Sequence, residues 1–253
     1  MDASAHNLDW HHWFARWEAM QNCYIPQRLY RFDLMLRLAG LPREDEVHIL
    51  DLGCGPGSLS FRALRYYPNG RIVAVDFDPI MLEIGQRVAS GPPESIRFLE
   101  ADLREHDWWA PYDETFDLIV SSTALHWLSE ESMTHVYEKA YRALTPGGRF
   151  FNSDHMASSD PQVQAQYERL LHVNQQSAFH VIGADDWEAF WHDLEQAIGD
   201  KVDRKDEELW EGTDSGLTRQ FHVEALRACG FAQVAFHWQD MGEAIIGAGK
   251  LQK

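Results

Sequence analysis

Apolar residues along the chain form short continuous runs that alternate with longer stretches of helical periodicity. The runs of strand length lie at 47–51, 71–76, 96–101, 116–122 and 148–154. Helical patterns follow several of these runs, at 58–67, after Asp78-Pro79 and at about 130–144. This alternation of strand and helix predicts a parallel, doubly wound α/β sheet with helices on both faces.

The same alternation resumes near the C-terminus after a long interruption. A helical pattern at about 218–229 precedes apolar strands at 231–238 and 243–249. The interruption, residues 155–216, contains helical patterns at about 161–180 and 186–198, the second with Asp185 and Glu188 at capping-box spacing. Because a sheet of this kind needs only a short connection here, we expect the insertion to pack as a helical lid over the strand ends.

The N-terminal segment is a second addition to the sheet. Aromatic side chains recur at steps of three and four through residues 10–24, which predicts an amphipathic helix, and a second helix is expected from Pro26 to about Gly40. The expected organisation is therefore an N-terminal helical cap at 1–42, a core made of 43–154 and 217–253, and the lid at 155–216.

Charge and cysteine content narrow the classes of partner. Lys and Arg number 22 against 40 Asp and Glu, which gives a net charge of −18 and a field that repels nucleic acid and anionic membranes. The three scattered cysteines show neither a disulfide framework nor zinc-ligand spacing, so we expect a reducing, cytoplasmic protein without a metal. Neither a membrane-spanning apolar stretch nor a signal-peptide pattern is evident.

The chemistry of the chain centres on the segment Ile49–Ser60. Asp51 ends an apolar run, glycines follow at 53, 55 and 57, and a helical pattern then begins. A strand, a glycine turn and a helix N-terminus together form a nucleotide-binding arrangement, because glycine lets the backbone approach a ligand and take positive φ. A dinucleotide fingerprint would require a third glycine at the position that Ser58 occupies.

An acid followed by three alternate glycines resembles motif I of the class I S-adenosylmethionine (SAM)-dependent methyltransferases. The resemblance extends over roughly residues 47–154 and the C-terminal strands. It implies a Rossmann-like sheet of seven strands, mostly parallel with the last strand antiparallel, and SAM as cofactor with S-adenosylhomocysteine as product. In that family the acid and the glycine backbone hold the methionyl end of SAM, which here implies Asp51, Gly53, Cys54, Gly55 and Gly57.

The ends of the later strands carry the remaining residues that this resemblance implies. Asp76, 19 residues beyond Gly57, is expected to bind the two ribose hydroxyls, and Phe77 to lie against the adenine. Asp102 is expected to accept from the adenine amino group, although it could instead cap a helix. The implied cofactor set is completed by Ala101, Leu103, Ser121 and, on the cofactor carboxylate, Arg28 with Arg31 as the second choice.

Residues for the methyl acceptor should follow strands four and five, because ligands of open α/β sheets bind beyond the carboxyl ends of the strands. His126 and His155 fall there, and either could be a general base, position the substrate or satisfy a structural hydrogen bond. Trp127 resembles the aromatic residue that lines the acceptor pocket in carboxylate-methylating relatives. Tyr24 and Asp154 complete the expected substrate pocket.

We therefore predict a SAM-dependent methyltransferase that acts on an oxygen, nitrogen or carboxylate of a small molecule. One alternative is a SAM-binding regulatory or scaffold protein without methyl transfer. Another is a nicotinamide-dependent oxidoreductase, which Ser58 and the strand-end acids argue against. A solvent-filled cavity under the lid would favour transfer, whereas a collapsed cavity would favour the binding protein.

Overall fold

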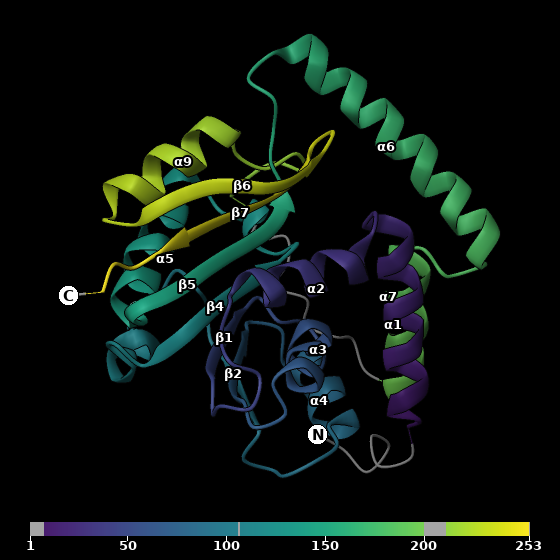
Figure 1. Ribbon diagram of the computed structural model, residues 1–253. Coiled ribbons are helices and arrows are strands. Elements are labelled where there is room, and N and C mark those ends of the chain that lie inside the picture. The colour runs from purple at the N-terminus through teal and green to yellow at the C-terminus, as the bar shows by residue number, and fades with distance from the viewer. Residues whose placement is uncertain (1–7, 106, 200–210, 253) are drawn as a thin grey trace.

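A seven-stranded sheet with the order β3-β2-β1-β4-β5-β7-β6 forms the centre of the molecule (Figure 1). The computed structural model describes residues 8–105, 107–199 and 211–252. Strands β3, β2, β1, β4 and β5 run parallel to one another, and β7 runs antiparallel to both of its neighbours, β5 and β6. The strands are β1 His48–Leu52, β2 Arg71–Asp76, β3 Ile96–Glu100, β4 Phe116–Ser122, β5 Leu144–His155, β6 Ala232–Asp240 and β7 Glu243–Gly249. The predicted α/β class and the antiparallel last strand are confirmed.

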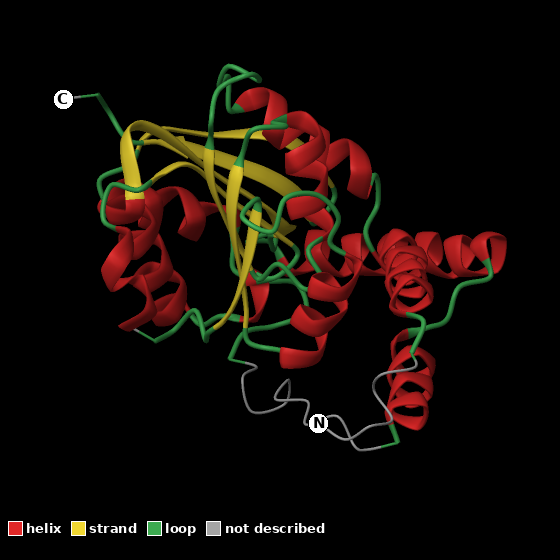
Figure 2. Cartoon of the chain, turned by 90° about the horizontal axis from the view of Figure 1, so that it is seen from below, coloured by secondary structure: helices red, strands yellow, loops and turns green. Residues whose placement is uncertain are grey.

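Helices cover both faces of this sheet, as Figure 2 shows. Alternate side chains of β1 point to opposite faces, with Leu50 and Leu52 in one apolar cluster and Ile49 in the other. The first cluster buries the sheet against α5 (Glu130–Ala143) and α9 (Arg219–Ala228). The second cluster buries it against α2 (Arg28–Leu38), α3 (Ser58–Tyr66) and α4 (Pro79–Val88).

Two helix starts show how local sequence fixes the elements near the strand ends. Asp78 caps α4 by accepting from the backbone N–H groups of Ile80 and Met81, as its position before Pro79 predicts. The capping residue expected for α7 (Trp187–Ile198) was wrong. Asp186 caps this helix by accepting from Ala189 N, while Asp185 pairs with Arg16 at 2.7 Å.

The N-terminal helix and the insertion form a third apolar cluster beside α4. Helix α1 (Trp10–Tyr24) packs on α4, on α7 and on α6 (Pro161–Ile182), and α6 extends away from the sheet (Figure 1). Trp13 and Met20 of α1 meet the buried Phe190 of α7 in this cluster. Residues 200–210 of the expected lid lie outside the described part of the chain.

We expect Phe190→Ala to loosen the packing of α1 against α7 without loosening the sheet. The Phe190 ring is fully buried, with its centroid 5.9 Å from that of Trp13 and 5.7 Å from that of Trp17. Truncating such a ring costs about 3–5 kcal/mol. Amide hydrogen exchange should therefore accelerate in α1 and α7 and stay unchanged in β1 and β4. The control is His192→Ala on the exposed face of α7. Equal acceleration of exchange in these two helices and in the two strands would contradict the expectation.

Candidate active site

A cavity of about 560 Å³ opens at the carboxyl ends of the parallel strands, where the strand order reverses between β1 and β4. Its volume lies within the range of about 300–1,000 Å³ that is usual for ligand sites. The wall combines the glycine loop, the ends of β2 and β3, the segment after β4, and side chains from α1, α2, α6 and α7. The residues proposed from sequence that line it are Tyr24, Arg28, Asp51, Gly53, Cys54, Gly55, Asp76, Phe77, Asp102, Leu103, His126, Trp127 and His155.

Four residues proposed from sequence lie behind this wall. Ser121 is fully buried and its hydroxyl donates to Leu52 O at 2.8 Å. The backbone of Ala101 donates to Asp76 O at 3.0 Å. Gly57 caps α3 in a left-handed conformation against Phe98, and Asp154 is buried against both histidines. These four residues therefore do not line the cavity and can act on it only through the residues that do.

The glycine loop is held in place by the carboxylate of Asp76. Gly55 N donates to Asp76 Oδ2 at 2.7 Å, and Asp78 N donates to Asp76 Oδ1 at 3.0 Å. Glycine is required at position 53, since its φ is +66° and an added Cβ would lie 2.3 Å from the Cβ of Ala124. The loop therefore presents backbone rather than side chain to the cavity.

Asp51 sits at the base of the cavity as a buried acid. Its carboxylate accepts from the Ser60 hydroxyl at 2.6 Å. Burial raises the pKa of Asp51 to about 7, the Ser60 hydrogen bond opposes this rise, and the charge of Asp76 adds to it. A cation bound beside Asp51 would favour its ionised form.

The end of the cavity near β3 is closed by an ion pair. Arg104 grips the Asp102 carboxylate, with Nε 3.0 Å from each oxygen and Nη2 2.6 Å from Oδ2. Nη1 of Arg104 reaches Glu211 Oε1 at 3.0 Å, so the end of the insertion is tied to this site. Burial would raise the pKa of Asp102, but its hydrogen bonds with Arg104 lower it. The carboxylate proposed to meet the adenine is thus paired with Arg104 in this structure.

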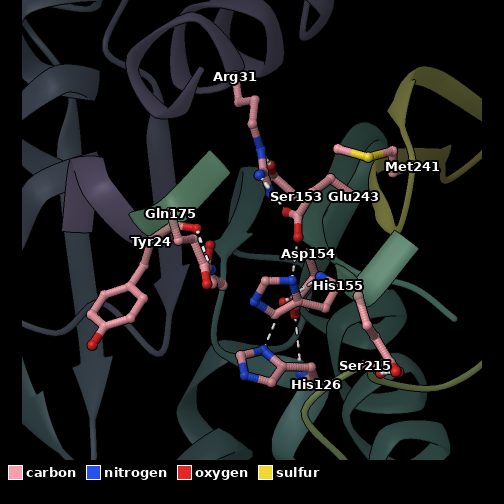
Figure 3. A network of polar contacts seen from close by, with 12 residues as sticks. Tyr24, Arg31, His126, Ser153, Asp154, His155, Gln175, Ser215, Met241 and Glu243 are labelled. Atoms are coloured by element: carbon pink, nitrogen blue, oxygen red, sulfur yellow. Dashed lines mark hydrogen bonds and ion pairs between the residues drawn. The ribbon is translucent and has the colours of Figure 1, made fainter. Parts of the chain in front are cut away.

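The opposite end of the cavity contains the two histidines and a buried acid (Figure 3). His126 Nδ1 lies 2.8 Å from Asp154 Oδ1, and the backbone N–H groups of Leu125 and His126 donate to Oδ2. The backbone of His155 donates to Oδ1 at 2.9 Å. Burial would raise the pKa of Asp154, but the charge of His126 and its hydrogen bond lower it to about 2. Asp154 therefore fixes the position of His126 as an ionised acceptor.

His155 is held from its other side by a second buried ion pair. Its Nδ1 contacts Glu243, whose other oxygen lies 2.5 Å from Arg31 Nη1, while Arg31 Nε donates to Ser153 Oγ at 2.7 Å. Burial would lower the pKa of His155, but the charge and hydrogen bond of Glu243 raise it. Arg31, the second choice for the cofactor carboxylate, is committed to this network and does not line the cavity.

Sequence reasoning missed Glu243, which was seen only as the start of the last strand. The antiparallel pairing of β5 and β7 places His155 directly opposite Glu243. A charged residue at the start of an apolar strand was the available signal, but the pairing register that gives it meaning is a tertiary property.

The rings of His126 and His155 lie side by side. Their centroids are 4.7 Å apart, and both residues line the cavity.

The fold and the cavity define a Rossmann-like protein with an open site at the switch point of its sheet. A methyltransferase-domain family model matches residues 49–148. A malonyl-[acyl-carrier protein] O-methyltransferase of Paenibacillus sp. (strain JDR-2) is 31% identical over 148 residues, which are 56% of this chain and 52% of that protein. A trans-aconitate 2-methyltransferase of Mycobacterium tuberculosis (strain ATCC 25177 / H37Ra) is 30% identical over 188 residues, 72% of this chain and 64% of that protein.

Solved structures agree with this fold. Human N-acetylserotonin methyltransferase in complex with SAM superposes with a TM-score of 0.56 at 19% identity, over 94% of this chain and 57% of that one. Residues 49–148 thus match a methyltransferase domain, in agreement with the motif I resemblance to the class I SAM-dependent methyltransferases. The chain spans about half the length of the curated relatives that it matches.

The described residues contain neither a cluster of metal-ligating side chains nor a membrane-spanning helix. No group of three or more His, Cys, Asp or Glu side chains in residues 8–105, 107–199 and 211–252 is placed to hold a metal ion. In the same part of the chain, no helix combines the length and the apolar character that crossing a bilayer requires.

The two buried ion pairs should give the fold a defined pH window. Asp154 and Glu243 each have a pKa lowered to about 2, from 3.8 and 4.5, so their stabilisation is present above those ordinary values and is lost as the pH falls through about 2. The pKa of His155 is raised from 6.5, so its contribution is present below 6.5 and is lost as the pH rises through the higher folded value. The network therefore stabilises most between about pH 4.5 and 6.5.

Glu243→Gln should move the titration midpoint of His155 to lower pH, because the variant removes the charge that raises the His155 pKa. The measurement is the imidazole C–H chemical shift of His155 against pH by NMR, in samples whose near-ultraviolet circular dichroism matches wild type. His237, whose pKa is lowered by burial and by Arg149, is the internal control and should not change. An unchanged His155 midpoint would show that Glu243 does not set it.

Proposed function

We propose that this chain transfers a methyl group from SAM to an oxygen, nitrogen or carboxylate of a small-molecule acceptor. The observation that carries the proposal is a single cavity whose wall includes both the glycine loop with Asp76 and the pair His126 and His155. Cofactor and acceptor can therefore occupy one connected space. SAM supplies an electrophilic methyl group, and the protein's part is to orient the acceptor and exclude water.

The charges around the cavity fit the charges of SAM. Arg28 has only 6% of its surface exposed and lines the cavity, so its guanidinium suits the methionyl carboxylate. Asp51, whose pKa is raised to about 7, suits the cationic ammonium and sulfonium end, which would favour its ionised form. The Asp76 carboxylate, 8% exposed, suits the ribose hydroxyls.

At the acceptor end, the two histidines take different roles in this proposal. Asp154 holds His126 by its Nδ1, an arrangement that supports a base receiving the acceptor's proton. Glu243 favours the protonated form of His155, which suits a hydrogen-bond donor that positions the acceptor. The Trp127 ring lies beside His126, with the ring centroids 5.8 Å apart, and both Trp127 and Tyr24 line the cavity.

The names of the relatives suggest where a search for the acceptor should start. One is named for malonyl-acyl-carrier protein and another for trans-aconitate, so both compounds belong in a first screen, with small phenols and amines beside them. The readout is release of S-adenosylhomocysteine from SAM. Binding of SAM without release in the presence of any acceptor would favour the alternative of a SAM-binding protein without transfer. The open cavity supports transfer over that alternative.

We expect Asp76→Ala to weaken S-adenosylhomocysteine binding by about 2–3 kcal/mol, the scale of hydrogen bonds to a charged group. Asp76→Asn should have a smaller effect, because an amide oxygen can still accept from Gly55 N. Isothermal titration calorimetry measures both variants against Asp33→Asn, which breaks an ion pair with Arg62 outside the cavity. Unchanged affinity in a folded Asp76→Ala variant would refute the site. A thermal shift with NADH but not with SAM would favour the oxidoreductase.

The lid should govern the acceptor rather than the cofactor. Leu171 and Gln175 of α6 line the cavity, as do Trp187 and Trp191 of α7. We expect Leu171→Ala to lower kcat/KM for the acceptor by about tenfold, the lower end of the effect of removing an apolar contact from a pocket, while S-adenosylhomocysteine affinity stays constant. Leu170→Ala is the matched control, because that neighbouring side chain is 53% exposed. Equal kinetics in both variants would show that α6 does not select the acceptor.

A further inference from the structure

Glu18 of α1 joins two residues of the cofactor end that come from different helices. Its Oε1 accepts from Arg28 Nη1 at 3.0 Å and from the Ser58 hydroxyl at 2.5 Å. Arg28 begins α2, Ser58 begins α3 directly after the glycine loop, and both line the cavity. Glu18 itself stands behind them, with its side chain 25% exposed.

Arg28 needs such a partner because its guanidinium is almost buried. Burial lowers the pKa of Arg28, and the charge of Glu18 opposes this effect. A guanidinium has five N–H donors, and within the described residues Glu18 is the acceptor that the structure gives it. The guanidinium carbon also lies 4.9 Å from the centroid of the Phe32 ring, a cation–π contact that restrains it further. Donors therefore remain for an anionic group in the cavity.

We propose that Glu18 is a positioning residue that holds Arg28 toward the amino-acid end of the cofactor, so that recognition of this end depends on the N-terminal helix. The inference rests on the proposed function. Glu18 fixes one donor of Arg28, and the planar guanidinium can then present its other donors to a carboxylate without losing further side-chain entropy. Ser58 ties Glu18 to the glycine loop, so the distance between Arg28 and that loop is set before the ligand arrives.

The same contact connects the cofactor to the cap. Helix α1 carries Glu18, and its Arg16 pairs with Asp185 and Asp193 of the insertion at 2.7 Å each. Trp17, between these two residues, lines the cavity, and a Cβ added to Gly55 would lie 3.6 Å from its ring. A ligand that engages Arg28 therefore also stabilises the position of α1 and, through it, of α7.

Two ligands that differ only at the amino-acid end test this role. S-adenosylhomocysteine carries the amino acid, and 5′-deoxy-5′-methylthioadenosine keeps the nucleoside and the sulfur but lacks it. In Glu18→Gln we expect the Kd of S-adenosylhomocysteine to rise about tenfold and that of methylthioadenosine to stay within about twofold, by calorimetry. Glu83→Gln is the matched control, because it removes a 2.8 Å ion pair with Arg87 on α4, where neither residue lines the cavity. It should change neither Kd.

The outcomes separate this inference from the proposed function. Equal weakening of both ligands would make Glu18 a structural support of α1 and overturn its positioning role, as would unchanged binding of both. Failure of the wild-type protein to bind either ligand would instead overturn the proposed function. If Glu18→Gln does not fold, Ser58→Ala takes its place. That variant loosens the anchor of Glu18 and should raise the Kd of S-adenosylhomocysteine alone, by about threefold.

Discussion

The geometry of the site depends on one carboxylate at the end of β2. Parallel pairing of β1 with β2 brings the ends of these two strands together. Asp76 then accepts from Gly55 N in the loop after β1 and from Asp78 N in the loop after β2. A single acid therefore both shapes the glycine loop and lines the cavity beside it. Because the loop is held by this acid before any ligand is present, binding pays little of the entropy that ordering a free glycine loop would cost.

The acceptor end relies on a different kind of constraint, a line of buried charges. Arg31 and Glu243 come from α2 and β7, and His155, Asp154 and His126 follow from β5 and the segment after β4. Burying such groups is costly unless each meets an opposite charge or a hydrogen bond, and a well-packed apolar core would be at least as stable. What the charges provide is fixed direction, since each histidine ring is oriented by a carboxylate behind it. This supports a chemical rather than a purely structural use of the pair.

Much of the fold and part of the site could be predicted because they are encoded locally. Strands such as 71–76 and 243–249 stand out as apolar runs, and the acids at strand ends are placed by the topology of any parallel sheet. Glu18, Arg104 and Glu243 could not be found in this way, since each acquires its role from a partner brought near by tertiary packing or strand register. The misplaced cap of α7 has a similar cause. Asp185 and Asp186 have equal local propensity, and the distant Arg16 takes the first.

Helix α1 is the element whose importance local sequence understates most. Its aromatic periodicity reads as packing, and Trp13 and Met20 do pack against α4 and α7. Yet the same helix carries Trp17 against the glycine loop, Glu18 behind Arg28 and Tyr24 in the cavity wall. His11, Ala15 and Asn22 follow one another at helical spacing on the exposed face of α1, so the remaining faces of the helix can contact α4, α7, the glycine loop and the cavity. The sheet supplies the floor of the site, and the helix that precedes it in the chain closes the space in which a sulfonium could be kept from water.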